Sequence, residues 1–298
     1  MREASESETN PFAPPSPPRL EEYAEKYKQS FVLERRNGIL QVRMHTDGGP
    51  AGRSGWAETW SQLWFEIGND RENEVIIITG TGDRWLDLPF TPEQAAAAGQ
   101  AMTSPHALFE AYLAGLKSTE GILFGINVPT IAAINGPAYV HSEFALLCDI
   151  TLCTTETYFR DPHAGWGLAP GDGLAMTLQE LMGAKRAAYY LYTSDAIDAQ
   201  RACEFGMVNE VLTADRLLPR AWEIAERILT MPKLARLMTK QIIRRQYQQR
   251  YVRDAAFQLA HEFVAGGVEM SSGDAMSSER LRAEEQRWQA AISARPPR

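Results

Sequence analysis

The segment from Pro129 to Gly173 constrains the fold of this chain more than any other. It opens with an apolar run, Thr130 to Ile134, whose length and lack of alternation are typical of a strand buried on both faces. Asn135-Gly136-Pro137 then predicts a turn. We expect a short helix from about Ser142 to Leu147 and a second strand from Asp149 to Cys153. The histidines and carboxylates of this segment therefore stand at the ends of buried elements, where rigid scaffolds commonly present chemistry.

Strands alternate with helices through the first two thirds of the chain, which predicts an α/β architecture with parallel strand pairing. An Asn37-Gly38 pair between two alternating runs predicts a β-hairpin. The expected strands are Phe31 to Arg36, Ile39 to His45 and Val75 to Thr79. The expected helices are Trp56 to Ile67, which carries apolar residues at helical spacing, and a region from Pro92 to Gly125 interrupted near Pro105.

The last third is predicted to be mostly helical. The expected helices are Leu174 to Leu181, Ala184 to Leu191, Asp198 to Glu204, Leu217 to Leu229, Pro232 to Val264 and Glu279 to Ala291, with one strand from Val208 to Leu212. We divide the chain into a disordered, proline-rich tail at 1–19, a core domain at 20–213, and a helical region at 214–298 that serves as a lid or an oligomer contact.

Composition excludes several classes of function. A net charge of −8 and a pI of about 5.3 disfavour binding to nucleic acid, whose footprint is a basic patch. The sequence contains no run of about 18 apolar residues, so we expect no membrane span. The N-terminus lacks the pattern of a signal peptide. Cys148, Cys153 and Cys203 show no metal-ligand spacing. Cys148 and Cys153 flank a predicted buried strand, so we interpret these two as small core residues, and we expect a reducing, cytoplasmic setting.

The strongest chemical pattern is His163 followed nine residues later by Asp172, across a glycine-rich turn. Asp172 lies between two glycines where a helix is expected to begin, so capping that helix is one explanation for it. The other explanation is that its carboxylate holds a nitrogen of His163. That contact would fix the tautomer and leave the other nitrogen to take a proton from water.

Three further residues could complete a site. His141 precedes a predicted helix and either begins it or donates a hydrogen bond to a carbonyl that becomes an oxyanion. Glu143 lies two residues later, and Glu262 lies in a mostly apolar helical stretch where a solvated edge position is the simpler explanation. His45 and His106 lie outside any such cluster.

Other catalytic patterns are missing from the sequence. No Gly-x-Ser-x-Gly elbow and no His-x-x-x-His pair occur in it. Gly80-Thr81-Gly82 follows a predicted strand, but it lacks the full dinucleotide fingerprint and the lysine of a P-loop. The remaining set of two histidines and several carboxylates fits activation of water on a carbonyl without a covalent intermediate, cofactor or metal.

These residues carry a family resemblance. Ile134-Asn135-Gly136-Pro137-Ala138, and then Glu143 to Ile150, resemble the central motif of the crotonase (enoyl-CoA hydratase/isomerase) superfamily. Thr79 to Trp85 resembles its first oxyanion-hole loop, and Phe159 to Gly173 its second catalytic segment. The resemblance spans about Phe31 to Val264. It implies a crotonase-like spiral of ββα units with a helical C-terminal region.

The chain also departs from the hydratases of that superfamily. Tyr139-Val140-His141 stands in place of three glycines, His163 in place of a second catalytic glutamate, and Pro89, which has no N–H, near the first oxyanion donor. The stretch from Trp85 to Leu116 contains no Lys or Arg to meet CoA phosphates. This substituted pattern is similar to a narrower group, 6-oxocamphor hydrolase and related cyclic β-diketone hydrolases.

That likeness implies the roles of the site residues. His163 and Asp172 would activate water, His141 would bind a substrate carbonyl, and Glu262 would complete the polar site. The residues expected to contact substrate are Trp85, Leu88, Tyr139, Trp166 and Glu143.

The implied reaction is a hydrolytic retro-Claisen cleavage of a cyclic β-diketone to a keto acid, without cofactor or metal. Likeness also implies a homotrimer or a dimer of trimers. Two alternatives remain open. One is a CoA-thioester hydratase or isomerase that uses Glu143, and the other is a non-catalytic member of the superfamily.

Overall fold

The fold is known from a computed structural model that describes residues 16–52, 56–86 and 104–293. Most of the tail expected at 1–19, and also Leu88 and Pro89, lie outside the described residues. The described chain begins with α1 (Leu20–Tyr27), a helix that the sequence analysis did not predict. Its Tyr23 and Tyr27 are buried against the core.

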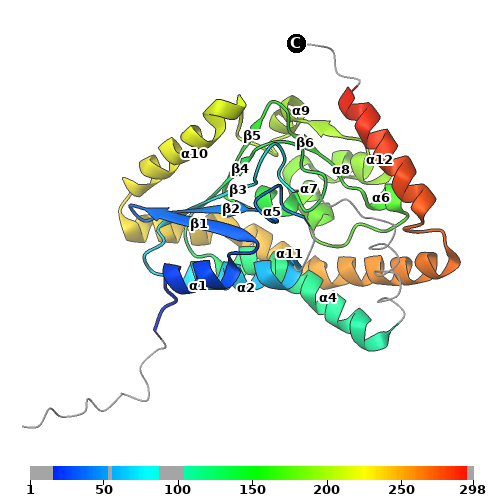
Figure 1. Cartoon of the computed structure of the whole chain (residues 1–298), viewed down its shortest axis with the longest axis horizontal. Coiled ribbons are helices and arrows are strands. Elements are labelled where there is room, and N and C mark those ends of the chain that lie inside the picture. The colour runs from blue at the N-terminus through cyan, green and yellow to red at the C-terminus, as the bar shows by residue number, and fades with distance from the viewer. Residues whose placement is uncertain (1–15, 53–55, 87–103, 294–298) are drawn as a thin grey trace, which may run out of the picture.

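A six-stranded sheet forms the centre of the fold (Figure 1). Its order is β1-β2-β3-β4-β5-β8, with β1 antiparallel to β2 and every later pair parallel. The strands are β1 (Phe31–Arg36), β2 (Ile39–Met44), β3 (Val75–Thr79), β4 (Thr130–Ile134), β5 (Ile150–Thr154) and β8 (Glu210–Leu212). The hairpin predicted at Asn37-Gly38 is confirmed, and both residues have the positive φ that its tight turn requires.

The two central strands are buried along their whole length, which explains their unbroken apolar sequences. All five residues of β3 and all five of β4 are buried. One sheet face packs on α10 (Ala214–Leu229) through Leu217, Ala221 and Ala225. The other face joins a larger core, to which α2 (Trp56–Asn69) contributes Trp60 and its neighbours. The tryptophans described on α2 are therefore core residues.

A group of shorter elements follows β4 and carries the polar segment. They are α5 (Glu143–Leu146), β6 (Tyr158–Phe159), α6 (His163–Trp166), α7 (Leu174–Met182), α8 (Ala184–Thr193), β7 (Ile197–Asp198) and α9 (Ala199–Glu204). Strands β6 and β7 pair as a separate two-stranded sheet. The sequence analysis did not predict α6, β6 or β7, because elements this short depend on tertiary contacts rather than on periodicity.

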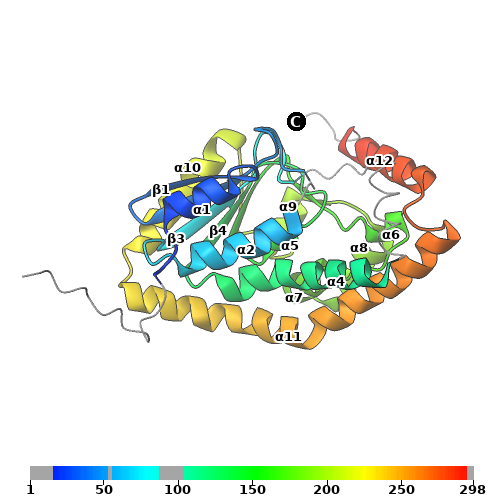
Figure 2. The same cartoon turned by 60° about the horizontal axis from the view of Figure 1, so that its bottom comes forward.

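Long helices enclose these elements. The helix α4 (Pro105–Glu120) begins where Ser104 caps it and continues as a π-helical turn, η1 (Gly121–Gly125). The helix α11 (Lys233–Ser272) runs past α4 and α7 and ends eight residues beyond the predicted Val264 (Figure 2). The last helix, α12 (Ser278–Ser293), turns back and packs on α6. None of the described helices is long and apolar enough to cross a membrane.

Candidate active site

Five polar side chains from four parts of the fold meet beside the end of β4. His141 and Glu143 stand at the start of α5, His163 begins α6, Asp172 precedes α7, and Glu262 lies on α11. The sequence analysis named all five. Imidazole nitrogens and carboxylate oxygens that lie 2.8 to 3.8 Å apart connect all five into one cluster.

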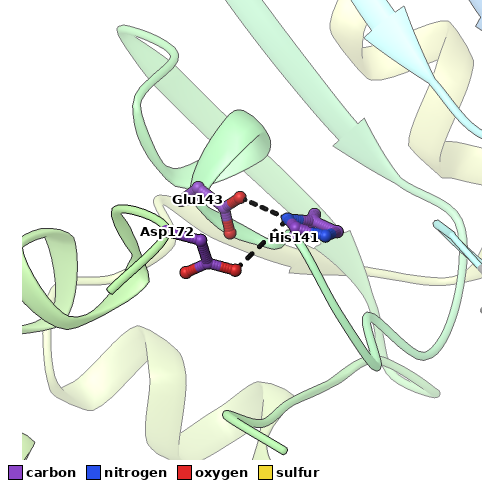
Figure 3. Close-up of side chains that lie close together, drawn as sticks. All are labelled: His141, Glu143 and Asp172. Carbon is purple, nitrogen blue, oxygen red and sulfur yellow. Dashed lines mark hydrogen bonds and ion pairs between the residues drawn. The ribbon is translucent and has the colours of Figure 1, made fainter. Parts of the chain in front are cut away.

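His141 is held against two carboxylates (Figure 3). Its Nδ1 lies 2.8 Å from Oε1 of Glu143 and 3.5 Å from Oδ2 of Asp172. The residue has a φ of 49°, in the left-handed region that few residues other than glycine adopt. Its ring stacks on Phe144 at 5.7 Å between centroids. The backbone and the stacking together fix which edge of the ring faces the carboxylates.

Asp172 contacts the start of α7 and is also a member of the cluster. Its Oδ1 accepts a hydrogen bond from the backbone N–H of Leu174 at 3.3 Å, in the first turn of α7. Its Oδ2 lies 3.5 Å from Nδ1 of His141 and 3.8 Å from Nε2 of His163. The direct hydrogen bond expected between Asp172 and His163 is therefore not formed, because 3.8 Å is too long for one. Asp172 faces the two imidazoles at once.

The carboxylate that does hydrogen-bond the ring of His163 is Asp161. Its Oδ1 lies 2.8 Å from Nδ1 of His163 and also accepts the backbone N–H of the same residue at 2.9 Å. The sequence analysis assigned no role to Asp161. The available signal was an Asp two residues before His163, since Asp side chains commonly accept the N–H two positions on.

Glu262 enters the site from α11 and contacts both His163 and the loop before α7. Its Oε1 lies 3.6 Å from Nε2 of His163, and its Oε2 accepts the backbone N–H of Gly171 at 3.1 Å. A Cβ atom at Gly171 would lie 2.5 Å from the backbone oxygen of Gln258 and 2.7 Å from Cβ of Glu262. Only glycine therefore allows α11 to approach this loop closely enough for Glu262 to face His163.

Burial and charge shift the protonation of two of these groups. Burial, and to a smaller extent the nearby charge of Asp172, raise the pKa of Glu143 to about 7 against the opposing effect of His141. For His163, burial disfavours the charged ring, but the negative charges of Asp161, Asp172 and Glu262 outweigh burial and raise its pKa well above 6.5. Both groups therefore hold protons at higher pH than they would in water.

The three aromatic residues predicted to contact substrate have different neighbours. The ring of Trp166 packs edge-on against His163 at 6.0 Å between centroids. Tyr139 packs on Trp288 of α12 at 4.5 Å. Trp85 is fully buried, and its backbone N–H donates to the oxygen of Pro137 at 3.1 Å, which ties the loop after β3 to the loop after β4. Contact of these residues with a substrate stays a prediction.

A buried ion pair connects α12 to the segment that precedes His163. Arg160 pairs with Glu284 of α12, and its guanidinium lies 4.9 Å from the ring centroid of Trp288. A Cβ at Gly165 would lie 2.2 Å from the carboxyl carbon of Glu284, so this glycine leaves room for the pair. Burial lowers the pKa of Arg160 to about 10. The sequence analysis predicted a helix here, in a region expected to serve as a lid or an oligomer contact, but it did not predict that this helix packs on α6.

Two other kinds of chemistry can be assessed from the side chains. Donor atoms of His141, Glu143 and Asp172 lie within 4.8 Å of one another and could hold a divalent cation. However, the 2.8 Å contact of His141 with Glu143 is an ordinary hydrogen bond, which a proton already satisfies. Cys148 and Cys153 are buried, as predicted, and burial raises the pKa of each thiol to about 12, which disfavours them as nucleophiles.

Comparisons of sequence match the chain to one family and to several of its named members. A model of the Enoyl-CoA hydratase/isomerase family matches residues 58–266. The crotonyl-CoA hydratase of Syntrophomonas wolfei subsp. wolfei is 33% identical over 58% of this chain, which spans 65% of that protein, slightly less than two thirds. The carnitinyl-CoA dehydratase of Proteus mirabilis (strain HI4320) is 32% identical over 72% of this chain and 80% of that protein.

Comparisons of structure add a different enzyme. A β-diketone hydrolase from the cyanobacterium Anabaena sp. PCC 7120, solved with (S)-3-oxocyclohexyl acetic acid bound, superposes with a TM-score of 0.77 at 33% identity. The match covers 83% of this chain and 97% of that one. An enoyl-CoA hydratase/isomerase from Mycobacterium paratuberculosis superposes with a TM-score of 0.73 over 87% of this chain and 98% of that one. At 21% identity the second match concerns the fold alone.

Proposed function

The chain belongs to the enoyl-CoA hydratase/isomerase family, and we propose that it is a hydrolase that cleaves the bond between two carbonyls of a cyclic β-diketone. One observation carries the proposal. His163 stands where hydratases resembling this chain would have a second catalytic glutamate, and its ring lies among the carboxylates of Asp161, Asp172 and Glu262. An imidazole in such a setting exchanges protons with water, and a water that attacks a ketone needs that exchange.

The first step is addition of water to one ketone. With Nδ1 of His163 facing Asp161, Nε2 is directed toward Asp172 and Glu262 at 3.8 and 3.6 Å. A water that hydrogen-bonds to Nε2 and to either carboxylate is held with its proton aimed at the ring. As the water oxygen bonds to the carbonyl carbon, its proton passes to Nε2, and the carbonyl oxygen becomes an alkoxide.

The second step breaks the carbon–carbon bond. The tetrahedral intermediate re-forms its carbonyl as a carboxylic acid and expels the carbon between the two original ketones, with the electron pair delocalised onto the second carbonyl as an enolate. The imidazolium of His163 then returns its proton to that carbon, which gives the keto acid. The substrate supplies its own electron sink, so the two steps together consume one water and no other reactant.

His141 is suited to stabilise the enolate oxygen. Burial raises the pKa of Glu143 to about 7, so at and below neutral pH its carboxyl group can carry a proton and donate it from Oε1 to Nδ1 of His141. The neutral ring then carries its hydrogen on Nε2 and can donate it to an oxyanion. Glu143 then acts by setting the protonation of His141.

Chemistry of the ligand in a related structure supports this substrate class. The β-diketone hydrolase from Anabaena was solved with a cyclic keto acid bound, and a keto acid is what hydrolytic cleavage of a bicyclic diketone yields. Neither a metal nor an organic cofactor enters the proposed chemistry. We also propose that the protein is cytoplasmic and acts as a homotrimer or a dimer of trimers.

The decisive experiment is a panel of cyclic 1,3-diketones, monocyclic and bicyclic, assayed by loss of the ultraviolet absorbance of the enol and by mass spectrometry of the product. Hydrolysis of at least one diketone to a keto acid with incorporation of one oxygen from H₂¹⁸O supports the proposal. Absence of turnover across the panel, with folded protein, would refute it.

A second candidate is a CoA-thioester hydratase or isomerase that uses Glu143. It is favoured by the names of the sequence relatives and by the raised pKa of Glu143, which suits an acid–base group. Titration calorimetry with acetoacetyl-CoA separates the two, since tight binding favours this candidate. The third, a non-catalytic family member, is excluded by turnover of any substrate in either assay.

A further inference from the structure

We propose that Asp161 is the positioning residue of this site: by accepting the Nδ1 hydrogen of His163, it fixes the orientation and tautomer of the ring and leaves Nε2 as the atom that exchanges protons. This inference deepens the proposed function, and its kinetic consequences rest on that function. Its central claim concerns the ring of His163 and can be tested without substrate.

The contacts of Asp161 are those of an orienting acceptor. One oxygen, Oδ1, receives both the backbone N–H of His163 at 2.9 Å and Nδ1 of the same residue at 2.8 Å. Its side chain is fully buried. A carboxylate has no hydrogen to donate, so the neutral ring must carry its hydrogen on Nδ1 for this contact to form. Nε2 is then the unprotonated, basic nitrogen.

Asp161 is itself held by neighbouring elements. The hydroxyl of Ser194, at the end of α8, donates to the backbone oxygen of Asp161. Ser194 has a φ of 56°, and its own backbone oxygen accepts the Nε hydrogen of Arg160 at 2.9 Å. Arg160 is paired with Glu284 of α12. Contacts from α8 and α12 therefore fix the backbone that carries Asp161 and His163.

The three carboxylates that face His163 differ in what else they hold. Asp172, before α7, accepts the N–H of Leu174, and Glu262, on α11, accepts the N–H of Gly171. Both lie beyond hydrogen-bond distance of Nε2, at 3.8 and 3.6 Å. The carboxylate of Glu284, on α12, forms an ion pair with Arg160. Asp161 is the one of these acids that lies within hydrogen-bond distance of the ring of His163.

The first test reads the ring directly. In protein labelled with ¹⁵N in its histidine rings, long-range ¹H–¹⁵N spectra are recorded across a pH series, and loss of one set of signals in His163→Asn assigns His163. We expect the neutral ring to carry its hydrogen on Nδ1, and its pKa to lie well above 6.5, since the charges of Asp161, Asp172 and Glu262 outweigh burial. A neutral ring with its hydrogen on Nε2 would overturn the proposal, whatever any variant does.

The second test removes one charge without changing shape. Asp161→Asn takes away one of the three negative charges, so the pKa of His163 and the acid limb of the kcat/KM profile should both move to lower pH. Because the amide can also present its NH₂ group and reverse the tautomer, kcat should fall by ~10²–10⁴. Asp195→Asn is the control: it removes one negative charge from a half-exposed residue that pairs with Arg287. It should leave the pKa of His163, the kcat/KM profile and kcat unchanged.

The two tests separate this inference from the proposed function. If diketones are not hydrolysed but His163 shows the Nδ1 hydrogen and responds to Asp161→Asn, the reaction is wrong and the positioning role stands. If diketones are hydrolysed while folded Asp161→Asn leaves the titration of His163 and the kinetic pH profile unchanged, the positioning role is wrong and the reaction stands.

Discussion

The backbone N–H of Gly171 donates a hydrogen bond to Oε2 of Glu262 at 3.1 Å, across 91 positions of sequence. This contact joins the loop that carries Asp172 to the long helix α11. A side chain at Gly171 would collide with the backbone oxygen of Gln258. The position of Glu262 in the site therefore depends on a residue that has no side chain.

Replacement of Gly171 by alanine should displace α11 from the loop. The new Cβ would lie 2.5 Å from a backbone oxygen, which cannot rotate away, so we expect a loss of about 1–3 kcal/mol in unfolding free energy. Diketone turnover should fall as well, since Glu262 moves away from His163. Gly267→Ala, on the same helix in open space, is the control and should be neutral or slightly stabilising. Equal behaviour of the two variants in urea unfolding would contradict the steric argument.

Replacement of His163 or Asp172 should slow turnover strongly without unfolding the protein. His163→Ala and Asp172→Asn should each lower kcat by ~10²–10⁴, the range for one positioned acid or base. Asp215→Asn, at the start of α10 away from the cluster, should keep full activity. Unimpaired cleavage by either site variant, measured by loss of enol absorbance, removes that residue from the mechanism.

Two substitutions at Glu143 distinguish its proposed roles. If Glu143 sets the protonation of His141, then Glu143→Gln can still donate to Nδ1 and should retain much of the activity, whereas Glu143→Ala should lose most of it. A hydratase that uses Glu143 as acid and base would be inactivated equally by both changes. Measurement of kcat for the two variants, on diketone and on an enoyl-CoA thioester, decides between these outcomes.

Protonation of the buried groups should make stability fall as pH rises. The pKa of Glu143 is raised to about 7 and that of His163 well above 6.5, so the folded state binds more protons than the unfolded chain. Their contribution to stability is complete at pH values below the unfolded pKa of each group. It declines between about 4.5 and 7 for Glu143 and above about 6.5 for His163. In His163→Gln, the free energy of unfolding measured with urea should no longer decline above about pH 6.5 because of His163. If that decline persists, another group causes it.

Exposed apolar side chains along α11 lead us to expect assembly of several copies. Leu234, Met238 and Ile242 recur every four residues and are 69, 50 and 74% exposed. A stripe of this kind on one chain marks a protein contact surface. Ile242→Glu should lower the mass measured by light scattering after size exclusion, while Gln286→Glu, on the exposed side of α12, should not. An unchanged mass for Ile242→Glu places the contact elsewhere.

Much of the framework could be predicted because local sequence decides it. The strands β3 and β4 were predicted to the residue, since their unbroken apolar runs suit burial on both faces. The sequence also indicated His141, Glu143, His163, Asp172 and Glu262 as one polar set, partly through family resemblance. What it could not indicate is which atoms of these groups face each other.

The sequence by itself determined the parallel α/β core and the residue types available for chemistry, because periodicity and turn residues act over a few positions. Only the tertiary structure decided that Asp161 rather than Asp172 hydrogen-bonds the ring of His163, and that α12 packs behind it. The reason is physical. The partner of a side chain depends on ring orientation and on the approach of elements distant in sequence, and both are fixed by packing of the whole chain.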